Sequence, residues 1–413
     1  MEEILRVMKL LIISQHFWPE NFRLNDLADE LCERGHEVTV LTGYPNYPGG
    51  KIYREFTEDP RKFDNLKKIK IFRVPILPRG NSNIALFLNY ISYIICSFIF
   101  GPLKLNGLVF DRIFVYQVSP ITVGLTAILF SKIKKAPIYF WVLDQWPETL
   151  VSMGIVRSKI LVSLFSILSK YIYKNCTCIL GQSESFLNNI KKYNVPKEKL
   201  FYFPNWAEDN FNQTNKVSIA PEILRTSKDF IILFAGNVGS AQGFESVIEA
   251  IKITERYGNI KWVIVGDGRD WSRVHRKVQD LNLTSVKMLG GFPLERMPEF
   301  YAAADALLLC LKSDPLFSIT IPGKLQTYLL SGKPILGMLN GEAASIIENS
   351  QSGLTCEAEN YKCLAENAWL MSRMSKSKRE KLGKNGRIYA KNFFIREKII
   401  DSLEVLLKTG PNK

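Results

Sequence analysis

Short apolar runs and helical patterns alternate along almost the whole chain, and this alternation constrains the fold more than any other feature. Residues 9–14 form an apolar run of strand length, residues 21–34 have a helical pattern closed by Gly35, and residues 37–41 form the next apolar run. Strands separated by helices pair in parallel, and helices cover both faces of a parallel sheet. The sequence therefore predicts an α/β fold built on doubly wound sheets.

The alternation is interrupted once, by a polar and irregular stretch at residues 206–229, and then starts again. We expect two Rossmann-like domains facing each other across a cleft, one over residues 1–206 and one over 207–392. The last helix, about 393–413, could pack back onto the first domain. The strands expected are residues 9–14, 37–41, 69–74, 112–116, 138–142 and 177–180, then 230–236, 261–265, 286–289, 306–310 and 334–338. Ligands of such sheets bind beyond the carboxyl ends of the strands.

The chain is strongly basic, with 54 Lys and Arg against 40 Asp and Glu, a net charge of +14 and a pI near 9.3. Such a balance favours anionic partners: nucleic acid, acidic lipid or phosphorylated ligands. The seven cysteines are scattered, and Cys176 and Cys178 stand too close together for a zinc pair. We expect reduced cysteines in the core of a cytoplasmic protein. The N-terminus, Met1-Glu2-Glu3, shows no secretory signal pattern.

Two apolar segments suggest contact with a membrane. Residues 80–103 carry no charge and are long enough to just cross a bilayer, but several Asn and Ser residues dilute them. A buried helix, a helix lying on a membrane surface and a true span all stay open. Residues 156–174 form a second apolar helical stretch whose only charges are positive. Anionic lipid would attract it by about 1 kcal/mol per basic residue; the alternative is a core helix with solvated lysines.

The strand-end loops of the first half carry polar and aromatic side chains. The loop after residues 9–14 contains His16, Glu20, Asn21 and Arg23, unless Glu20 or Asn21 only caps the next helix. The loop at 42–50 contains Tyr44, which could stack on a sugar ring.

After residues 138–142 come Asp144 and Trp146. A carboxylate there can hold a sugar hydroxyl or take a proton; the alternative is an N-cap Asp beside a packed Trp.

The loops of the second half are rich in glycine. Residues 236–243 and 266–268 allow backbone N–H groups to approach a phosphate or a base closely. Residues 317–336 read as a loop, a helix that opens at Pro322-Gly323-Lys324, a glycine stop at Gly332 and a new strand. Lys324 puts a cation beside the free N–H groups of a helix start, which suits a diphosphate. Ordinary turns and a capped helix with a solvated lysine are the alternatives.

These glycine loops follow one another at successive strand ends, and their order resembles the nucleotide-sugar half of a retaining GT-B glycosyltransferase of family 4. The resemblance covers nearly the whole chain. The segments 16–20, 144–149 and 204–206 are similar to the bacterial branch that builds O-antigen and capsule repeat units, in particular to WbuB-like transferases. Those enzymes use UDP-linked N-acetylated deoxyhexoses such as N-acetyl-L-fucosamine.

The resemblance implies transfer of such a sugar, with retention, from a UDP-sugar to a polyprenyl-diphosphate-linked saccharide. It implies no cofactor and no metal, and a place on the cytoplasmic face of the bacterial membrane, with anionic lipid as a partner. The first domain would bind the acceptor and the second the donor. The catalytic residues expected are Asp144, His16 and Lys324. The acceptor residues expected are Glu20, Asn21, Arg23, Tyr44 and Trp146. The donor residues expected are Gly236, Asn237, Gly239, Gln242, Gly266, Asp267, Gly268, Phe292, Ser318, Thr320, Gly323, Lys324, Gln326 and Thr327.

The chain departs from the family pattern at four positions. Asn237 and Gln242 stand where the family has an Arg and a Lys that bind the donor diphosphate, and Ile319 and Thr327 stand where it has two Glu. We expect Lys324 to substitute for the missing cations, and Gln326 or Thr327 to bond the ribose.

Two other functions remain open from the sequence. A nucleotide-sugar 2-epimerase has the same fold, but its cleft needs carboxylates and His in both halves, and the second half is poor in them. A basic nucleic-acid-binding protein would suit the charge, but it would leave the glycine loops unexplained.

Overall fold

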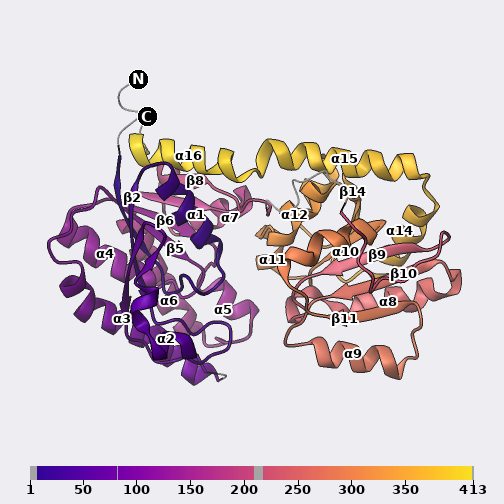
Figure 1. Cartoon of the computed structure of the whole chain (residues 1–413), viewed down its shortest axis with the longest axis horizontal. Coiled ribbons are helices and arrows are strands. Elements are labelled where there is room, and N and C mark those ends of the chain that lie inside the picture. The colour runs from indigo at the N-terminus through magenta and orange to yellow at the C-terminus, as the bar shows by residue number, and fades with distance from the viewer. Residues whose placement is uncertain (1–6, 81, 209–216, 412–413) are drawn as a thin grey trace. The chain divides into compact units, whose positions relative to one another are not determined.

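The computed structural model describes residues 7–80, 82–208 and 217–411. The chain divides into two compact units, Met1–Phe203 with Ile400–Lys413, and Pro204–Ile399 (Figure 1). The sequence placed the boundary between residues 206 and 207. Part of the irregular stretch at 206–229, and the start at Met1-Glu2-Glu3, lie outside the described residues.

The first unit is built on an eight-stranded sheet in the order β3-β4-β2-β1-β5-β6-β7-β8. Neighbouring strands are parallel except for the short β3, which pairs antiparallel with β4. The central apolar strands are almost wholly buried, as a sheet covered on both faces requires. The bounds are β1 Lys9–Ile13, β2 Glu37–Gly43, β3 Asn65–Leu66, β4 Ile69–Val74, β5 Arg112–Gln117, β6 Ile138–Val142, β7 Cys178–Gly181 and β8 Leu200–Tyr202.

Helices α3, α4 and α6 form one layer on this sheet. Right-handed crossovers from β4 to β5, β5 to β6 and β6 to β7 put their helices on the same face, and α4 contacts both α3 and α6. The helices of this unit are α1 Arg23–Glu33, α2 Arg54–Glu58, α3 Asn83–Lys104, α4 Val123–Lys134, α5 Glu148–Ser152, α6 Lys159–Asn175 and α7 Glu184–Lys191.

Helix α3 turns its polar side inward. Its buried residues are Asn89, Tyr93, Ser97 and Gly101, spaced by four along one stripe. Asn89 Oδ1 accepts from Gln15 Nε2 (2.6 Å), and the Ser97 and Thr126 hydroxyls are 2.7 Å apart. The apolar residues of α3 are left exposed, and in the described part of the chain it is the one helix long and apolar enough to cross a membrane by length and composition.

The second unit is built on a six-stranded parallel sheet in the order β11-β10-β9-β12-β13-β14. Alternate residues of β9 enter two buried clusters, Ile231 and Leu233 in one and Ile232 and Phe234 in the other, so both faces of the sheet are covered. The strands are β9 Phe230–Ala235, β10 Ile260–Val265, β11 Val286–Gly290, β12 Ala306–Cys310, β13 Ile335–Met338 and β14 Gly353–Cys356.

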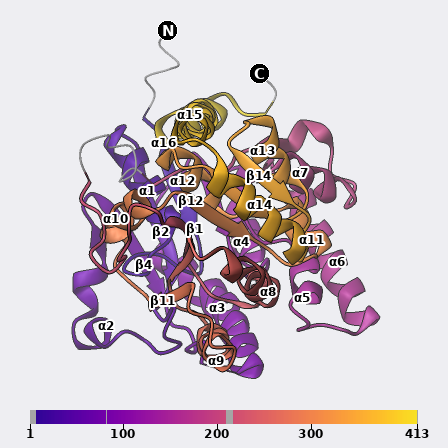
Figure 2. The ribbon, with the colours of Figure 1, turned by 90° about the vertical axis from the view of Figure 1, so that its right-hand side faces the viewer.

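Helices α13 and α14 both pack against the edge strand β14 (Figure 2). The helices of the second unit are α8 Phe244–Thr254, α9 Trp271–Asp280, α10 Met297–Ala303, α11 Pro315–Ile319, α12 Gly323–Ser331, α13 Glu342–Asn349, α14 Tyr361–Arg373 and α15 Lys376–Phe393.

The last helix, α16 (Arg396–Thr409), has its residues from Ile400 onward in the first unit. Arg34 pairs there with Asp401 and Glu404, and Arg112 Nε donates to the Leu407 carbonyl (2.7 Å). These contacts tie the C-terminal turns to the amino-terminal unit.

Candidate active site

Each sheet has one point where the strand order reverses. In the first sheet it lies between β1 and β5, and in the second between β9 and β12. Ligands of open α/β sheets bind beyond the strand ends at such points. His16 follows β1 and Ser119 follows β5, whereas Gly236 follows β9.

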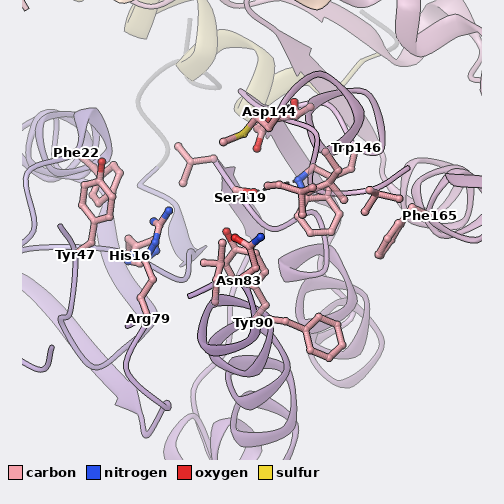
Figure 3. A pocket seen from close by; sticks show the side chains of 18 residues that line it. His16, Phe22, Tyr47, Arg79, Asn83, Tyr90, Ser119, Asp144, Trp146 and Phe165 are labelled. Atoms are coloured by element: carbon pink, nitrogen blue, oxygen red, sulfur yellow. Dashed lines mark hydrogen bonds between the residues drawn. The ribbon is translucent and has the colours of Figure 1, made fainter. Parts of the chain in front are cut away.

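The first unit holds a cavity of about 400 Å³ at its reversal point. Figure 3 shows His16, Phe22, Tyr47 and Arg79 on one side and Trp146 and Phe165 on the other. The full lining is His16, Phe22, Tyr47, Arg79, Asn83, Leu86, Phe87, Tyr90, Val118, Ser119, Asp144, Trp146, Thr149, Leu150, Met153, Ile155, Val156 and Phe165. Most of these side chains are apolar or aromatic, and a few polar groups converge among them, as in sites for small organic ligands.

His16 is held from behind by Glu20. Its Nδ1 lies 3.0 Å from Glu20 Oε2, and both side chains are buried. Glu20 also accepts the backbone N–H groups of Asn46 (2.8 Å), Tyr47 (2.7 Å) and Phe17 (3.2 Å). An ionised carboxylate can only accept, so Nδ1 carries a proton and donates it, which leaves Nε2 as the acceptor in a neutral ring. Glu20 is absent from the cavity lining and therefore positions His16.

Asp144 lies in the cavity wall, near Ser119 and Trp146 (Figure 3). Burial raises the pKa of this carboxyl to about 6, partly offset by a hydrogen bond from Thr149. The alternative that Asp144 caps a helix is not what the structure shows, because α5 has Pro147 at its N-cap position and no side-chain cap. Above about pH 6, Asp144 is thus placed to accept a hydrogen bond from a hydroxyl of a ligand.

The structure brings together three of the residues expected in the first unit, His16, Asp144 and Trp146, around one cavity. Three others lie outside its lining besides Glu20. Asn21 is exposed, Arg23 is the first residue of α1, and the Tyr44 ring packs against Phe56 at 4.9 Å.

The sequence missed several lining residues. Tyr47 lies in the loop at 42–50, where the sequence predicts only Tyr44 as a ligand contact. Arg79 immediately precedes the uncharged segment at residues 80–103. No local pattern marks Tyr90, Ser119 or Phe165, because their nearness to His16 depends on the order of the strands.

In the second unit the glycine turns pack against each other. A Cβ on Gly266 would lie 1.8 Å from the Gly236 carbonyl oxygen, and one on Gly268 would lie 2.5 Å from the Val238 oxygen; both have positive φ, 134° and 155°. The Gly236 N–H donates to Val265 O, and the Val238 N–H donates to Asp267 O, each at 2.8 Å. The contact between loops thus suffices to require these glycines, without any nucleotide.

Gln242 shapes the loop in which it lies. Its Oε1 accepts a hydrogen bond from the Gly239 N–H at 2.9 Å. The Gln242 side-chain amide, which was expected to hold a diphosphate, therefore already has a partner within the loop. Asn237 packs beside the same glycine.

Lys324 is the most unusual group of this unit. Its Nζ is inaccessible to solvent, although the side chain as a whole is part-exposed, and within the described ranges it has no hydrogen-bond partner. It lies 3.8 Å from the centroid of the Phe234 ring. Burial lowers the pKa of this amine to about 8. A buried cation without a hydrogen-bond acceptor is costly unless a ligand supplies one.

Of the other donor residues expected, Gln326 and Thr327 lie within α12, Ser318 and Thr320 lie just before it, and Phe292 follows β11. Ser318 and Thr320 hydroxyls donate to backbone carbonyls of the preceding turn, and Thr327 Oγ1 accepts the Glu208 N–H at 3.4 Å. The amide of the buried Gln326, in the orientation that satisfies it, donates to the Pro322 and Gly323 carbonyls. The Phe292 ring packs on Phe300, at 4.8 Å between centroids. Their part in donor binding stays a prediction, as does the absence of a metal, although no group of three or more potential metal ligands occurs among the residues described.

Residues 215–389 match the family model of the glycosyl transferases group 1. This stretch is a glycosyltransferase group 1 domain. The chain is 25% identical over 342 residues to the putative colanic acid biosynthesis glycosyl transferase WcaI of Escherichia coli, covering 79% of this chain and 82% of that protein. It is 26% identical over 252 residues to the probable glycosyltransferase WbjE of Pseudomonas aeruginosa, covering 59% and 62%. The protein is a glycosyltransferase.

Solved structures support the fold. The sucrose-phosphate synthase of Thermosynechococcus elongatus matches with a TM-score of 0.74 at 14% identity, over 97% of this chain and 98% of that one. WaaG, a glycosyltransferase involved in lipopolysaccharide biosynthesis, matches with 0.68 at 16%, over 97% and 100%. HepE of Anabaena, solved with UDP and glucose, matches with 0.69 at 15%, over 97% and 100%. The predicted GT-B fold class, with two Rossmann-like sheets, is confirmed.

Proposed function

We propose that the protein moves a sugar from a UDP-sugar to a polyprenyl-diphosphate-linked saccharide, with retention of configuration, in the synthesis of O-antigen or capsule. An N-acetylated deoxyhexose such as N-acetyl-fucosamine is the sugar we favour. A relative named for colanic acid biosynthesis, and a similar structure solved with UDP and glucose, support this proposal. The observation that carries it is Lys324, whose buried Nζ lacks a hydrogen-bond acceptor within the described chain.

The diphosphate of the donor would supply that acceptor. Lys324 stands in the first turn of α12, where the helix dipole also favours an anion. Its amine, kept from water and ready to meet the charge that develops on the leaving group, would stabilise the transition state. The departing phosphate would take the acceptor proton, so no side-chain base is required. Asp144 and His16 would hold hydroxyls of a sugar.

The outer layer of the first unit would bring the enzyme to its lipid-linked acceptor. Helices α3, α4 and α6 contain no Asp or Glu, whereas α4 and α6 carry lysines, and α3 exposes apolar side chains along its length. Anionic lipid complements this combination of apolar surface and positive charge. We propose peripheral binding to the cytoplasmic face of the bacterial membrane, without a metal or other cofactor.

A thermal-shift screen over nucleotide sugars, followed by transfer to a bacterial lipid extract, tests the donor assignment. We expect UDP and at least one UDP-sugar to raise the Tm, and mass spectrometry to find the lipid-linked product only when that sugar is present. The anomeric coupling of the product in NMR reports retention. No stabilisation by any nucleotide would refute the proposal, and conversion of the UDP-sugar without acceptor would point to the 2-epimerase.

A further inference from the structure

We infer that the cavity of the first unit binds the lipid-phosphate end of the acceptor, with its phosphate at Arg79 and its first isoprene units on the apolar wall formed by α3, the connection between α5 and α6, and the start of α6. The identity of this ligand as an acceptor rests on the proposed function. The site itself is built from three observations: an apolar wall, an apolar mouth and a cation that has no anionic partner in the described ranges.

The apolar wall comes from elements far apart in sequence. Leu86 and Phe87 line the cavity from α3, Phe165 lines it from α6, and Ile155 and Val156 line it from the connection between α5 and α6. A cavity of about 400 Å³ takes a ligand of small-molecule size, so a long polyprenyl chain has to leave through the mouth.

The mouth is apolar too. Phe87 and Met153 both line the cavity, yet they are 56% and 63% exposed. On α3 the exposed side chains of Ile84, Leu88 and Ile91 continue the surface outward from Phe87. A polyprenyl chain that leaves the cavity past Phe87 therefore stays on apolar surface. Covering this surface with hydrocarbon removes it from water, which is favourable.

Arg79 provides the polar end. Its guanidinium lies over the Tyr47 ring, 5.3 Å from the centroid, and its backbone N–H donates to the buried Asn46 (3.0 Å). No carboxylate lies within 4 Å of its guanidinium in the part of the chain that the structure describes. A guanidinium held against an aromatic ring is well suited to bind phosphate oxygens. Asp144, from the loop after β6, repels an anion when it is ionised, so the groups that bind beside it should be hydroxyls.

The test uses a soluble probe, benzophenone-farnesyl diphosphate, with the full chain and no membrane. We expect light to label peptides from residues 83–104 and 149–165, and farnesyl diphosphate to compete at least tenfold better than farnesol or inorganic diphosphate.

Phe87→Asn should weaken labelling about tenfold. Ile95→Asn is the matched control, since Ile95 is 52% exposed on the same helix and does not line the cavity. Arg79→Gln should make farnesol and farnesyl diphosphate compete alike.

Labelling elsewhere, an equal loss in Phe87→Asn and Ile95→Asn, or full competition by inorganic diphosphate would overturn the inference. Equal competition by farnesol in the wild type would overturn the phosphate assignment to Arg79. These outcomes are separate from the fate of the proposed function. A chain that is labelled as expected but turns over no UDP-sugar keeps the site and contradicts the proposed donor. Transfer from a UDP-sugar with labelling elsewhere keeps the proposed function and contradicts the site.

Discussion

At the scale of single residues, the two groups that matter most are a cation and a carboxylate held inside the protein. Lys324 has no hydrogen-bond acceptor among the described residues and has a pKa lowered to about 8 by burial, whereas Glu20 accepts hydrogen bonds from three backbone N–H groups and from His16. The first is arranged to meet a ligand, and the second holds another side chain in place.

Lys324 should make UDP binding depend on pH. Because its folded-state pKa of about 8 lies below the ordinary 10.5, the unfolded chain holds more protons between these values, so stability should rise as the pH rises from 8 to 10.5. A bound diphosphate favours the charged amine, so UDP affinity should fall over the same window, with proton uptake on binding. Binding calorimetry in two buffers of different ionisation enthalpy measures both the UDP affinity and the proton uptake.

Lys324→Arg keeps its charge throughout and should bind UDP with a flat pH profile, while Lys324→Met should lower turnover by about 10²–10³. The methionine variant should also unfold at a higher temperature in the absence of ligand, because a buried amine without an acceptor has been removed. Identical pH profiles for wild type and Lys324→Arg would contradict this role.

Glu20→Gln should lower kcat, and it should change the KM for the UDP-sugar less than it changes kcat. The amide no longer requires the proton on His16 Nδ1, so the ring loses its fixed tautomer. Measured in a double-mutant cycle with His16→Ala, the effect of Glu20→Gln on kcat should nearly vanish. Full additivity of the two changes would show that Glu20 acts only through stability.

At the scale of elements, the loops and helices carry constraints imposed by their neighbours. Gly266 and Gly268 allow two strand-end turns to pack in direct contact. The polar stripe of α3 makes hydrogen bonds with Gln15 and Thr126. In both cases the local sequence looks unusual until the partner is known.

Gly266→Ala should destabilise the second unit strongly, because its Cβ would meet the Gly236 oxygen at 1.8 Å in a backbone with φ of 134°. Gly291→Ala is the matched control, since its Cβ would find only Asp267 Cβ at 3.7 Å. Thermal unfolding with and without UDP should show a fall of several degrees in the first variant alone. Equal Tm values would mean that the two loops move apart at little cost.

The inverted helix α3 allows a paired test. Ser97→Leu places a large side chain on the buried stripe and should lower the Tm. Ile99→Ser acts on a side chain that is 55% exposed, so the Tm should stay unchanged while binding to anionic vesicles weakens. Vesicle sedimentation and thermal unfolding measure the pair; a lower Tm for Ile99→Ser would argue that this face is covered within the protein.

At the scale of the whole molecule, the net charge of +14 and the acid-free layer of α3, α4 and α6 act together. Binding to vesicles containing anionic lipid should fall steeply between 0.1 and 0.5 M salt, as the Debye length shortens from about 10 Å. Neutral vesicles serve as the control and should bind weakly at all salt concentrations. Binding that is insensitive to salt would leave only the apolar face as the source of affinity.

The sequence by itself determined the local elements. Some features depend only on neighbouring residues, and the structure has them where they were expected. They are continuous apolar runs such as β1 and β9, the glycine stop at Gly332 and the helix start at Pro322-Gly323-Lys324. The strand-end rule also selected His16 and Asp144 for one site. The short edge strands β3, β8 and β14 were missed, because such brief strands leave little periodic signal.

Only the tertiary structure decided what surrounds those residues. The order of strands brings Arg79, Tyr90 and Phe165 to the cavity of His16, and the Asn46 and Tyr47 N–H groups turn Glu20 from an expected ligand contact into a support. The physical reason is that hydrogen bonds and packing between distant segments, such as Gln15 with Asn89, have no counterpart in the periodicity of either segment. For the same reason, the apolar residues of α3 are compatible by sequence with a buried core helix, although the structure leaves them exposed.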